Sequence, residues 1–310
     1  MMDNLTHTLV GLALAESGLK RTTRLATAAL IVGANLPDVD GLVYLFGSGT
    51  DGLAFRRGWT HGVLAMILLP PLLVAVLLGW HRLRGKSRDG LRVGWLVTLA
   101  AVAIWSHPLL DLLNTYGVRL LMPFSGRWFY GDALFIVDPW LWVTLLLGIL
   151  LARRARGPSS AGRPAQAALL VASVYALLMA AGSRIAERRL DREAPAPAQR
   201  SLASPVPGNP LRRETVRQLD GGYERGRLRL IPWEFLPLGT SPSGADLAGA
   251  AAAARTAPGA AFLAWARFPY YRTVSVGDSL DVTIADARYG GGGNRSWASV
   301  TVRVAAADRR

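Results

Sequence analysis

Residues 62–80 read GVLAMILLPPLLVAVLLGW and carry no charged side chain. A helix of this length can cross the ~30 Å hydrocarbon core of a bilayer, and prolines are tolerated in transmembrane helices. Three further apolar stretches lie at 91–110, 138–152 and 165–182, and two weaker ones at 4–17 and 22–36. The sequence therefore predicts a mainly α fold, a polytopic transmembrane helical bundle of four to six spans.

The composition argues against a nucleic-acid partner and limits the residue types that could bind a metal. Of the 310 residues 51% are hydrophobic and 18% charged, and the net charge is +14. The basic residues form short bursts between the apolar stretches rather than one patch, so we expect no nucleic-acid partner. The chain has no cysteine, which excludes disulfides and thiolate metal ligands and leaves His, Asp, Glu and Asn to hold any metal.

Charge also predicts the orientation of the spans. The connections around 20–24, 81–92 and 153–163 are rich in Arg and Lys, and such loops tend to stay in the cytoplasm. Placing all three there gives six crossings with both termini outside the cytoplasm. A basic cluster at 184–192 would then lie outside, diluted by nearby acidic residues. We expect a multi-pass protein of the bacterial inner (plasma) membrane with its C-terminal part outside the cytoplasm.

In this orientation the polar residues of the membrane half gather on the outer side, whereas His81 falls on the opposite side. Each has a structural reading when taken alone: Pro37-Asp38 can end a helix, Thr60 can cap one, and His107 before Pro108 can mark a bend. Together they indicate function, because ionisable groups near a membrane are costly. His107, Asp111 and Asn114 are spaced four and then three apart, which places them on one helix face.

Neutral imidazole with carboxylate suits a divalent metal, with zinc as the first expectation and manganese or iron as alternatives. The candidate metal ligands are His7, Asp38, Asp40, His61, His107 and Asp111. The carboxylates expected to act in catalysis are Asp38, Asp40 and Asp111, one as a general base. Candidates for substrate contact or for support of the ligands are Asn35, Arg57, Asn114, Asp132 and Asp138.

Five motifs carry a family resemblance: DNLTHTLVG at 3–11, NLPDVD at 35–40, RGWTHG at 57–62, SHPLLD at 106–111 and NTYG at 114–117. In this order they resemble the YdjM-like family over residues 1–185. The resemblance implies an inner-membrane, metal-dependent hydrolase, described for some members as LexA-binding, a link that this sequence does not support. In outline the motif order is also similar to zinc-dependent phospholipase C enzymes, which implies a phosphoester or lipid substrate.

Beyond the membrane half, residues 186–210 are rich in Pro, Ala and Ser and predict a linker. Residues 211–310 predict a small α+β domain outside the membrane, with strands at 213–219, 222–231, 272–276, 279–285 and 296–304 and a helix at 245–254. This region contains no histidine, so we expect no second metal centre there.

Two functions of different class remain open. The first is a membrane-bound metal-dependent hydrolase with its site at the outer interface, acting on a phosphoester, small-molecule or lipid substrate. The second is a non-enzymatic transporter or binding protein whose metal or ligand site is structural. Transporters more often place polar groups near the midplane, which favours the first. A serine hydrolase is a poor fit, because no Gly-x-Ser-x-Gly elbow occurs.

Overall fold

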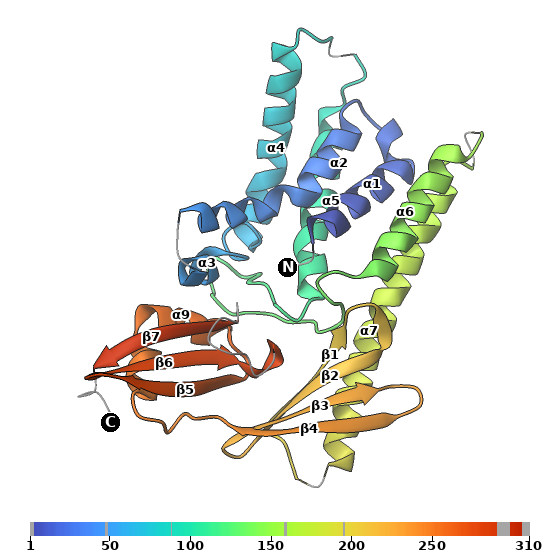
Figure 1. Cartoon of the computed structure of the whole chain (residues 1–310). Coiled ribbons are helices and arrows are strands. Elements are labelled where there is room, and N and C mark those ends of the chain that lie inside the picture. The colour runs from blue at the N-terminus through green and yellow to red at the C-terminus, as the bar shows by residue number, and fades with distance from the viewer. Residues whose placement is uncertain are drawn as a thin grey trace. The chain divides into compact units, whose positions relative to one another are not determined.

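The computed structural model describes residues 3–46, 49–87, 89–157, 160–194, 196–289 and 298–305. These form two compact units (Figure 1). The first unit comprises Met1–Asp40, Arg57–Ala181 and Pro207–Pro210, and the second comprises Gly41–Arg56, Gly182–Val206 and Leu211–Arg310.

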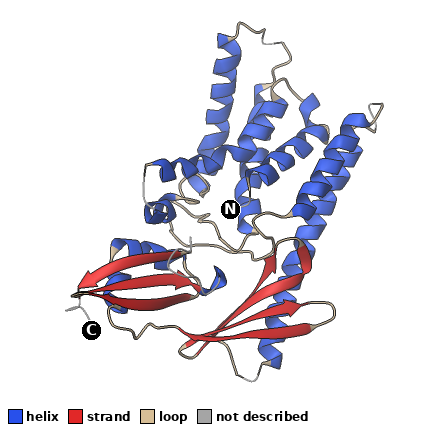
Figure 2. Cartoon of the chain, in the orientation of Figure 1, coloured by secondary structure: helices blue, strands red, loops and turns tan. Residues whose placement is uncertain are grey.

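The first unit is helical (Figure 2). Its helices are α1 (Asn4–Glu16), α2 (Ala26–Asn35), α4 (Val63–Leu83), α5 (Val93–Leu112), α6 (Pro139–Arg154) and the first part of α7 (Arg163–Glu193). A short 3₁₀ turn, η1 (Leu19–Arg21), follows α1, and a longer one, η2 (Leu36–Leu45), continues α2. Side-chain caps start two helices: Asp3 accepts from the amide of Thr6 at α1, and Asp138 accepts from two amides of α6.

Within the described ranges, four helical stretches are long and apolar enough to cross a membrane: Ala26–Leu45, Val63–Leu83, Val93–Leu112 and Arg163–Glu193. Three coincide with predicted spans, and the predicted span at 22–36 extends to Leu45 through η2. The segments predicted at 4–17 and 138–152 are helices α1 and α6, with 13 and 16 residues. Both are shorter than the ~20 residues of a full crossing. The prediction of a mainly α, multi-span fold is confirmed.

Small residues bring α1, α2 and α5 into close contact. A Cβ on Gly11 of α1 would lie 2.7 Å from the carbonyl oxygen of Leu30, and one on Gly33 of α2 would lie 3.0 Å from the Cβ of Ala103 in α5. Such glycines let membrane helices approach closely. The resulting core cluster is Ala15, Ala26, Leu30, Ala34, Leu99 and Ala103. This packing fixes the ends of three helices that carry candidate site residues.

The second unit contains two antiparallel sheets, which confirms the predicted small C-terminal α+β part. One sheet has the order β1-β2-β3-β4 and the other β5-β6-β7. The strands are β1 (Arg200–Val206), β2 (Asn209–Leu219), β3 (Gly222–Arg229), β4 (Glu234–Pro242), β5 (Pro269–Val276), β6 (Ser279–Asp286) and β7 (Ser299–Ala305). The helices are α3 (Gly49–Phe55), α8 (Ala250–Arg255) and α9 (Ala257–Trp265), with a 3₁₀ turn η3 (Ala287–Tyr289).

Strands β2, β3, β5 and β6 lie where the alternating pattern placed them, whereas β4 and α9 were not predicted. The strand predicted at 296–304 is β7 from Ser299, and residues 296 and 297 lie outside the described ranges. The helix predicted at 245–254 begins at Ala250 and ends at Arg255.

The structure corrects the prediction of a linker over 186–210. Residues up to Glu193 continue α7, and Arg200–Val206 form β1 at the edge of its sheet. Its proline is tolerated because an edge strand has one side free of the hydrogen-bond ladder. The segment is held by burial, since Ala186, Leu190, Ala203 and Leu228 make one core cluster. Its Pro/Ala composition suggested a linker, but its small apolar residues fill a core instead.

Candidate metal centre

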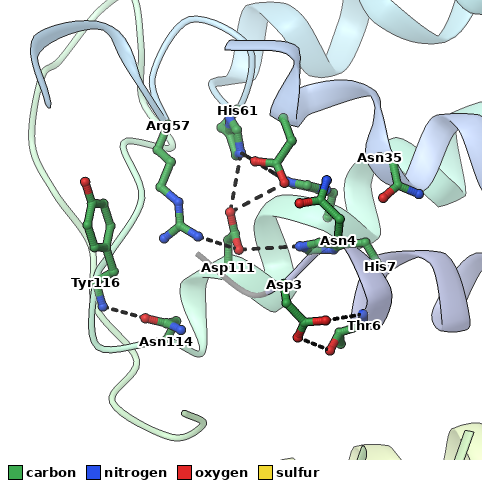
Figure 3. Close-up of polar contacts among 12 residues, drawn as sticks. Asp3, Asn4, Thr6, His7, Asn35, Arg57, His61, Asp111, Asn114 and Tyr116 are labelled. Atoms are coloured by element: carbon green, nitrogen blue, oxygen red, sulfur yellow. Dashed lines mark hydrogen bonds and ion pairs between the residues drawn. The ribbon is translucent and has the colours of Figure 1, made fainter. Parts of the chain in front are cut away.

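Three elements of the first unit carry four converging residues. His107 and Asp111 are one turn apart on α5, Asp38 lies in η2 directly after α2, and His61 precedes α4. The side chains of His61, His107 and Asp111 are fully buried, and that of Asp38 is 4% exposed. Figure 3 shows His61, Arg57 and His7 turned toward Asp111, the first two from the segment before α4 and His7 from α1. One ligand atom from each of the four residues lies within 4.8 Å of all the others.

The spacing of these four atoms matches a small cation. His61 Nε2 lies 3.4 Å from Asp111 Oδ2 and 3.1 Å from His107 Nε2, which is 3.6 Å from the same carboxylate oxygen. Asp38 Oδ1 lies 3.9 Å from His61 Nε2 and 3.7 Å from His107 Nε2. A tetrahedral metal with bonds of about 2.1 Å separates its ligand atoms by roughly 3.4 Å. The donor set of two imidazoles and two carboxylates therefore fits a divalent metal such as zinc.

Hydrogen bonds fix both imidazole tautomers. The Nδ1 of His107 lies 2.7 Å from the carbonyl oxygen of Ala34, which only accepts, so Nδ1 carries the proton. Thr60 donates its hydroxyl proton to Asp40, 2.9 Å away, and therefore accepts from His61 Nδ1, also 2.9 Å away. In the neutral rings the Nε2 atoms of both histidines then carry lone pairs and face the carboxylate oxygens of Asp38 and Asp111. These four atoms all accept hydrogen bonds, and a cation between them would stabilise the arrangement.

The pKa of His61 also indicates that a positive charge is favoured at this place. Burial lowers its pKa, but hydrogen bonds to Asp111 and Asp40 and the charge of both carboxylates raise it by more, so the pKa lies above its ordinary value. The surroundings of His61 thus favour positive charge at its ring, whether that charge comes from a proton or from a metal ion.

Arg57 holds the second oxygen of Asp111. Its Nη2 lies 2.7 Å from Asp111 Oδ1, and its Nη1 donates to the carbonyl oxygen of Gly117 at 2.7 Å. The side chain is 1% exposed, and its backbone φ of 53° is rare for a residue with a Cβ. Arg57 was predicted to contact substrate or to support the ligands. In the structure it is bound to a candidate ligand and leaves Asp111 Oδ2 turned to the other three ligand atoms.

Asp40, predicted as a ligand, lies behind His61. Its Oδ2 accepts from the amide of Arg57 at 2.7 Å and from Thr60, and lies 3.3 Å from His61 Nδ1. A carboxylate in this place orients the histidine and makes its other nitrogen a stronger ligand. The structure thus places Asp40 in support of a ligand, outside the group of four.

His7, also predicted as a ligand, stacks on His107 with ring centroids 3.7 Å apart, and its Nε2 lies 3.6 Å from Asp111 Oδ1. The side chain is fully buried, and neither ring nitrogen has a hydrogen-bond partner among the described residues. His7 is brought to the site but faces the Asp111 oxygen that Arg57 holds, outside the group of four.

Asn35 is the last residue of α2 and lies three residues before Asp38. Its Nδ2 donates to Thr8 and to the carbonyl oxygen of Ile31. With Asn4 and Asp38 it lines an open pocket of about 420 Å³ whose remaining wall is apolar, formed by Ile31, Val32, Leu36 and Val39. Asp38 is the member of the group of four that lines this pocket.

The other three predicted residues lie in or beside the loop after α5. Asn114 is buried, and its Oδ1 accepts from the amide of Tyr116. Asp132 is fully buried with a φ of 54°. Asp138 caps α6 and accepts from the hydroxyl of Tyr175 at 2.9 Å. None of the three belongs to the group of four, and the contacts of Asp138 are those of a helix cap.

Sequence reasoning missed two kinds of supporting group. Thr60 was considered as a helix cap, whereas it bridges Asp40 and His61; its position beside a histidine was the available signal. The carbonyl oxygens of Ala34 and Gly117 hold His107 and Arg57, and backbone groups carry no signal in side-chain identity.

The chain is similar to a known protein family and to two bacterial proteins. The YdjM inner membrane protein family matches residues 2–186. The uncharacterized protein YfhP of Bacillus subtilis is 27% identical over 161 residues, 48% of this chain and 46% of YfhP, so the chain spans about half of that relative. The inner membrane protein YbcI of Escherichia coli is 31% identical over 156 residues, 42% of this chain and 85% of YbcI. No solved structure matches significantly.

The family match covers more than half of the chain and contains every residue of the group of four. The family and the apolar helices together support an inner-membrane location. The chain belongs to the YdjM inner membrane protein family.

Proposed function

We propose that this protein is a membrane-bound metal-dependent hydrolase acting on phosphoester substrates. The observation that supports it most is the convergence of four acceptor atoms from Asp38, His61, His107 and Asp111, beside a pocket that reaches Asp38. These four residues would hold the cation. When bound, a divalent metal supplies Lewis-acid activation of water and of a phosphoryl oxygen.

Asp38 is the carboxylate best placed to move a proton. Arg57 engages Asp40 and Asp111, whereas Asp38, whose side chain is 4% exposed, lines the open pocket. A general base must lie near the proton that it removes, and of the three predicted catalytic carboxylates Asp38 is the one that lines this pocket. Asp40, Thr60 and Arg57 act as positioning residues for His61 and Asp111.

The proposal includes the side of the membrane on which the site works. The basic loops between the spans favour a site at the outer interface and a C-terminal domain outside the cytoplasm. Zinc is the metal that the two-imidazole, two-carboxylate set suits first, with manganese and iron as alternatives.

The test begins with elemental analysis of the detergent-purified full chain. We expect about one divalent metal per wild-type chain, and loss of that metal in the double variant His61→Ala, His107→Ala. His81→Ala is the matched control, because His81 lies outside the group of four and its Nε2 is 2.8 Å from the carbonyl oxygen of Ser87. Metal content equal in all three proteins, or absent from the wild type after reconstitution with zinc, manganese and iron, would contradict the site.

Activity is tested separately with a diester such as bis-p-nitrophenyl phosphate. Asp38→Asn changes both a candidate ligand and the candidate general base, so it is assayed with metal in excess, and we expect turnover to fall by about 10²–10⁴-fold. If wild type loaded with metal turns over no phosphoester, the hydrolase proposal fails and the metal site stands.

One observation favours a second candidate, a non-enzymatic protein with a structural metal. Three of the four residues are fully buried, and structural sites are closed. In that case all ligand substitutions, Asp38→Asn included, would lower the melting temperature together, and no substrate would be consumed.

A further inference from the structure

A second cavity lies in the helical unit, between α1, α5, α6 and α7. We call it the lateral cavity; its volume is about 240 Å³. Its lining is Thr6, Val10, Ser106, Leu109, Leu110, Leu113, Leu134, Leu141, Leu145, Leu169, Ala172, Ser173 and Ala176. Apart from three hydroxyls, every side chain in this lining is aliphatic.

The three hydroxyls are satisfied without a ligand. Thr6 donates to Asp3 at 2.7 Å and accepts from the indole N–H of Trp142 at 2.9 Å. Ser106 and Ser173 donate to carbonyl oxygens of their own helices, at 2.7 and 2.8 Å. No lining residue has a buried side-chain polar atom without a hydrogen bond. An aliphatic lining without unpaired polar atoms favours an apolar ligand over water.

Two lining residues are exposed on helices that are candidates to cross the membrane. Leu109 of α5 is 59% exposed, and Ser173 of α7 is exposed. Both lie within helices that are long and apolar enough to span a bilayer. The medium beside them is therefore lipid, which supplies apolar chains at high local concentration.

The lateral cavity adjoins the metal cluster. Thr6, Ser106 and Leu110 line it, and the next residue in each case is His7, His107 or Asp111. Consecutive residues of a helix point to neighbouring faces. One face of α1 and α5 thus carries the cluster, and the adjacent face carries the cavity wall.

We propose that the lateral cavity binds one fatty acyl chain of a membrane lipid, with the polar head of that lipid at the metal cluster. A cavity of about 150 Å³ takes a benzene molecule, so this one accommodates on the order of ten chain carbons on the same scale. As a binding site the cavity stands by itself. As the place of a substrate chain it rests on the proposed function, and it narrows the substrate to phosphoester lipids.

The test fills the cavity and counts retained lipid. Ala172→Phe places a ring in the lining, and Ala167→Phe, the same change at an exposed position of α7 outside the lining, is the control. Each full-length protein is reconstituted in vesicles of phosphatidylethanolamine and phosphatidylglycerol, extracted in a delipidating detergent and examined by native mass spectrometry. We expect one retained phospholipid in wild type and in Ala167→Phe, and at least a tenfold lower occupancy in Ala172→Phe.

Ala176→Leu, a smaller filling change, serves if Ala172→Phe does not fold, as judged by circular dichroism and gel filtration. The proposal is overturned if the filled, folded variant retains lipid like wild type, or if the control loses lipid equally. It is also overturned if filling changes the oligomeric state without changing retained lipid, since the cavity would then receive a second copy of the chain.

A kinetic arm separates this proposal from the hydrolase itself. We expect Ala172→Phe to raise KM about tenfold for a long-chain phospholipid and to leave KM unchanged for bis-p-nitrophenyl phosphate. An equal rise for both substrates contradicts an acyl site. If no protein hydrolyses any substrate but filling still removes the lipid, the acyl site is supported and the hydrolase proposal fails.

Discussion

Arg57 and Asp111 form a buried ion pair at the centre of the site. Both side chains are at most 1% exposed, and the two charged groups meet at 2.7 Å. A carboxylate removed from water is costly unless it is paired. Here the pair also has a directional consequence, because Arg57 takes one oxygen and the other faces the two histidines. The pairing therefore selects which Asp111 oxygen is offered to a metal.

Removing Arg57 should thus affect both stability and metal. We expect Arg57→Ala to lower the free energy of unfolding by about 3–5 kcal/mol, the usual effect of leaving one buried charge unpaired, and to weaken metal retention. Thermal denaturation in detergent and elemental analysis measure the two effects. Arg82→Ala, at an exposed position, is the control, and equal melting temperatures for the two variants would contradict this account of Arg57.

Thr60 is not in the group of four but contacts one of its members, His61. Its hydroxyl is hydrogen-bonded to both Asp40 and His61. Loss of such a supporting partner typically costs 10–100-fold in metal affinity, and we expect that range for Thr60→Val in a competition with a zinc chelator. Thr98→Val removes a hydroxyl that donates only to a carbonyl of its own helix and should leave affinity unchanged. An unchanged affinity in Thr60→Val would mean that the hydroxyl does not position His61.

At the level of elements, the site depends on how closely α2 approaches α5. Gly33 packs against Ala103 at a distance that leaves no room for a longer side chain. Asp38 follows the end of α2, and His107 lies one turn beyond Ala103 on α5. A change in the spacing of these two helices therefore moves ligands toward or away from each other.

We expect Gly33→Leu to push the helices apart, with a loss of about 1–3 kcal/mol from overpacking and a lower metal stoichiometry. Gly79→Leu is the matched change, because a Cβ at Gly79 meets no described atom within 4 Å. Melting curves and metal content of the two variants decide the matter. If Gly33→Leu binds metal like wild type, the α2–α5 contact does not set the ligand spacing.

For the whole molecule, the charge of the loops predicts which parts face the cytoplasm. The chain has no cysteine, so a single introduced thiol reports its own location. We expect Ser241→Cys in β4 to react with a membrane-impermeant maleimide in intact spheroplasts. Ser87→Cys, in the loop between α4 and α5, should react only after the membrane is permeabilised. The reverse pattern would place the C-terminal part in the cytoplasm and the metal cluster near the inner face.

Local patterns in the sequence were enough to predict most of the helices and the type of site. An apolar run as long as 62–80 predicts a membrane-spanning helix without knowledge of the rest of the fold. The sequences of β2, β3, β5 and β6 show the alternation that is typical of strands. The residue types at 38, 61, 107 and 111 indicated metal by their chemistry. The i, i+4 spacing placed His107 and Asp111 together, because helix geometry is local.

The tertiary structure decided the division of roles among those residues. Whether His7 or Asp38 completes the group of four depends on the angles and spacing of α1, α2 and α5, which are set by contacts such as Gly11 on Leu30 and Gly33 on Ala103. The tertiary structure also decides the role of Asp40, which lies behind His61 because of the turn of η2. It likewise decides that the proline-rich stretch forms β1, because Ala203 packs in one core cluster with Leu228. Periodicity and composition describe neighbours in sequence, whereas ligand sets and core membership arise between residues distant in sequence.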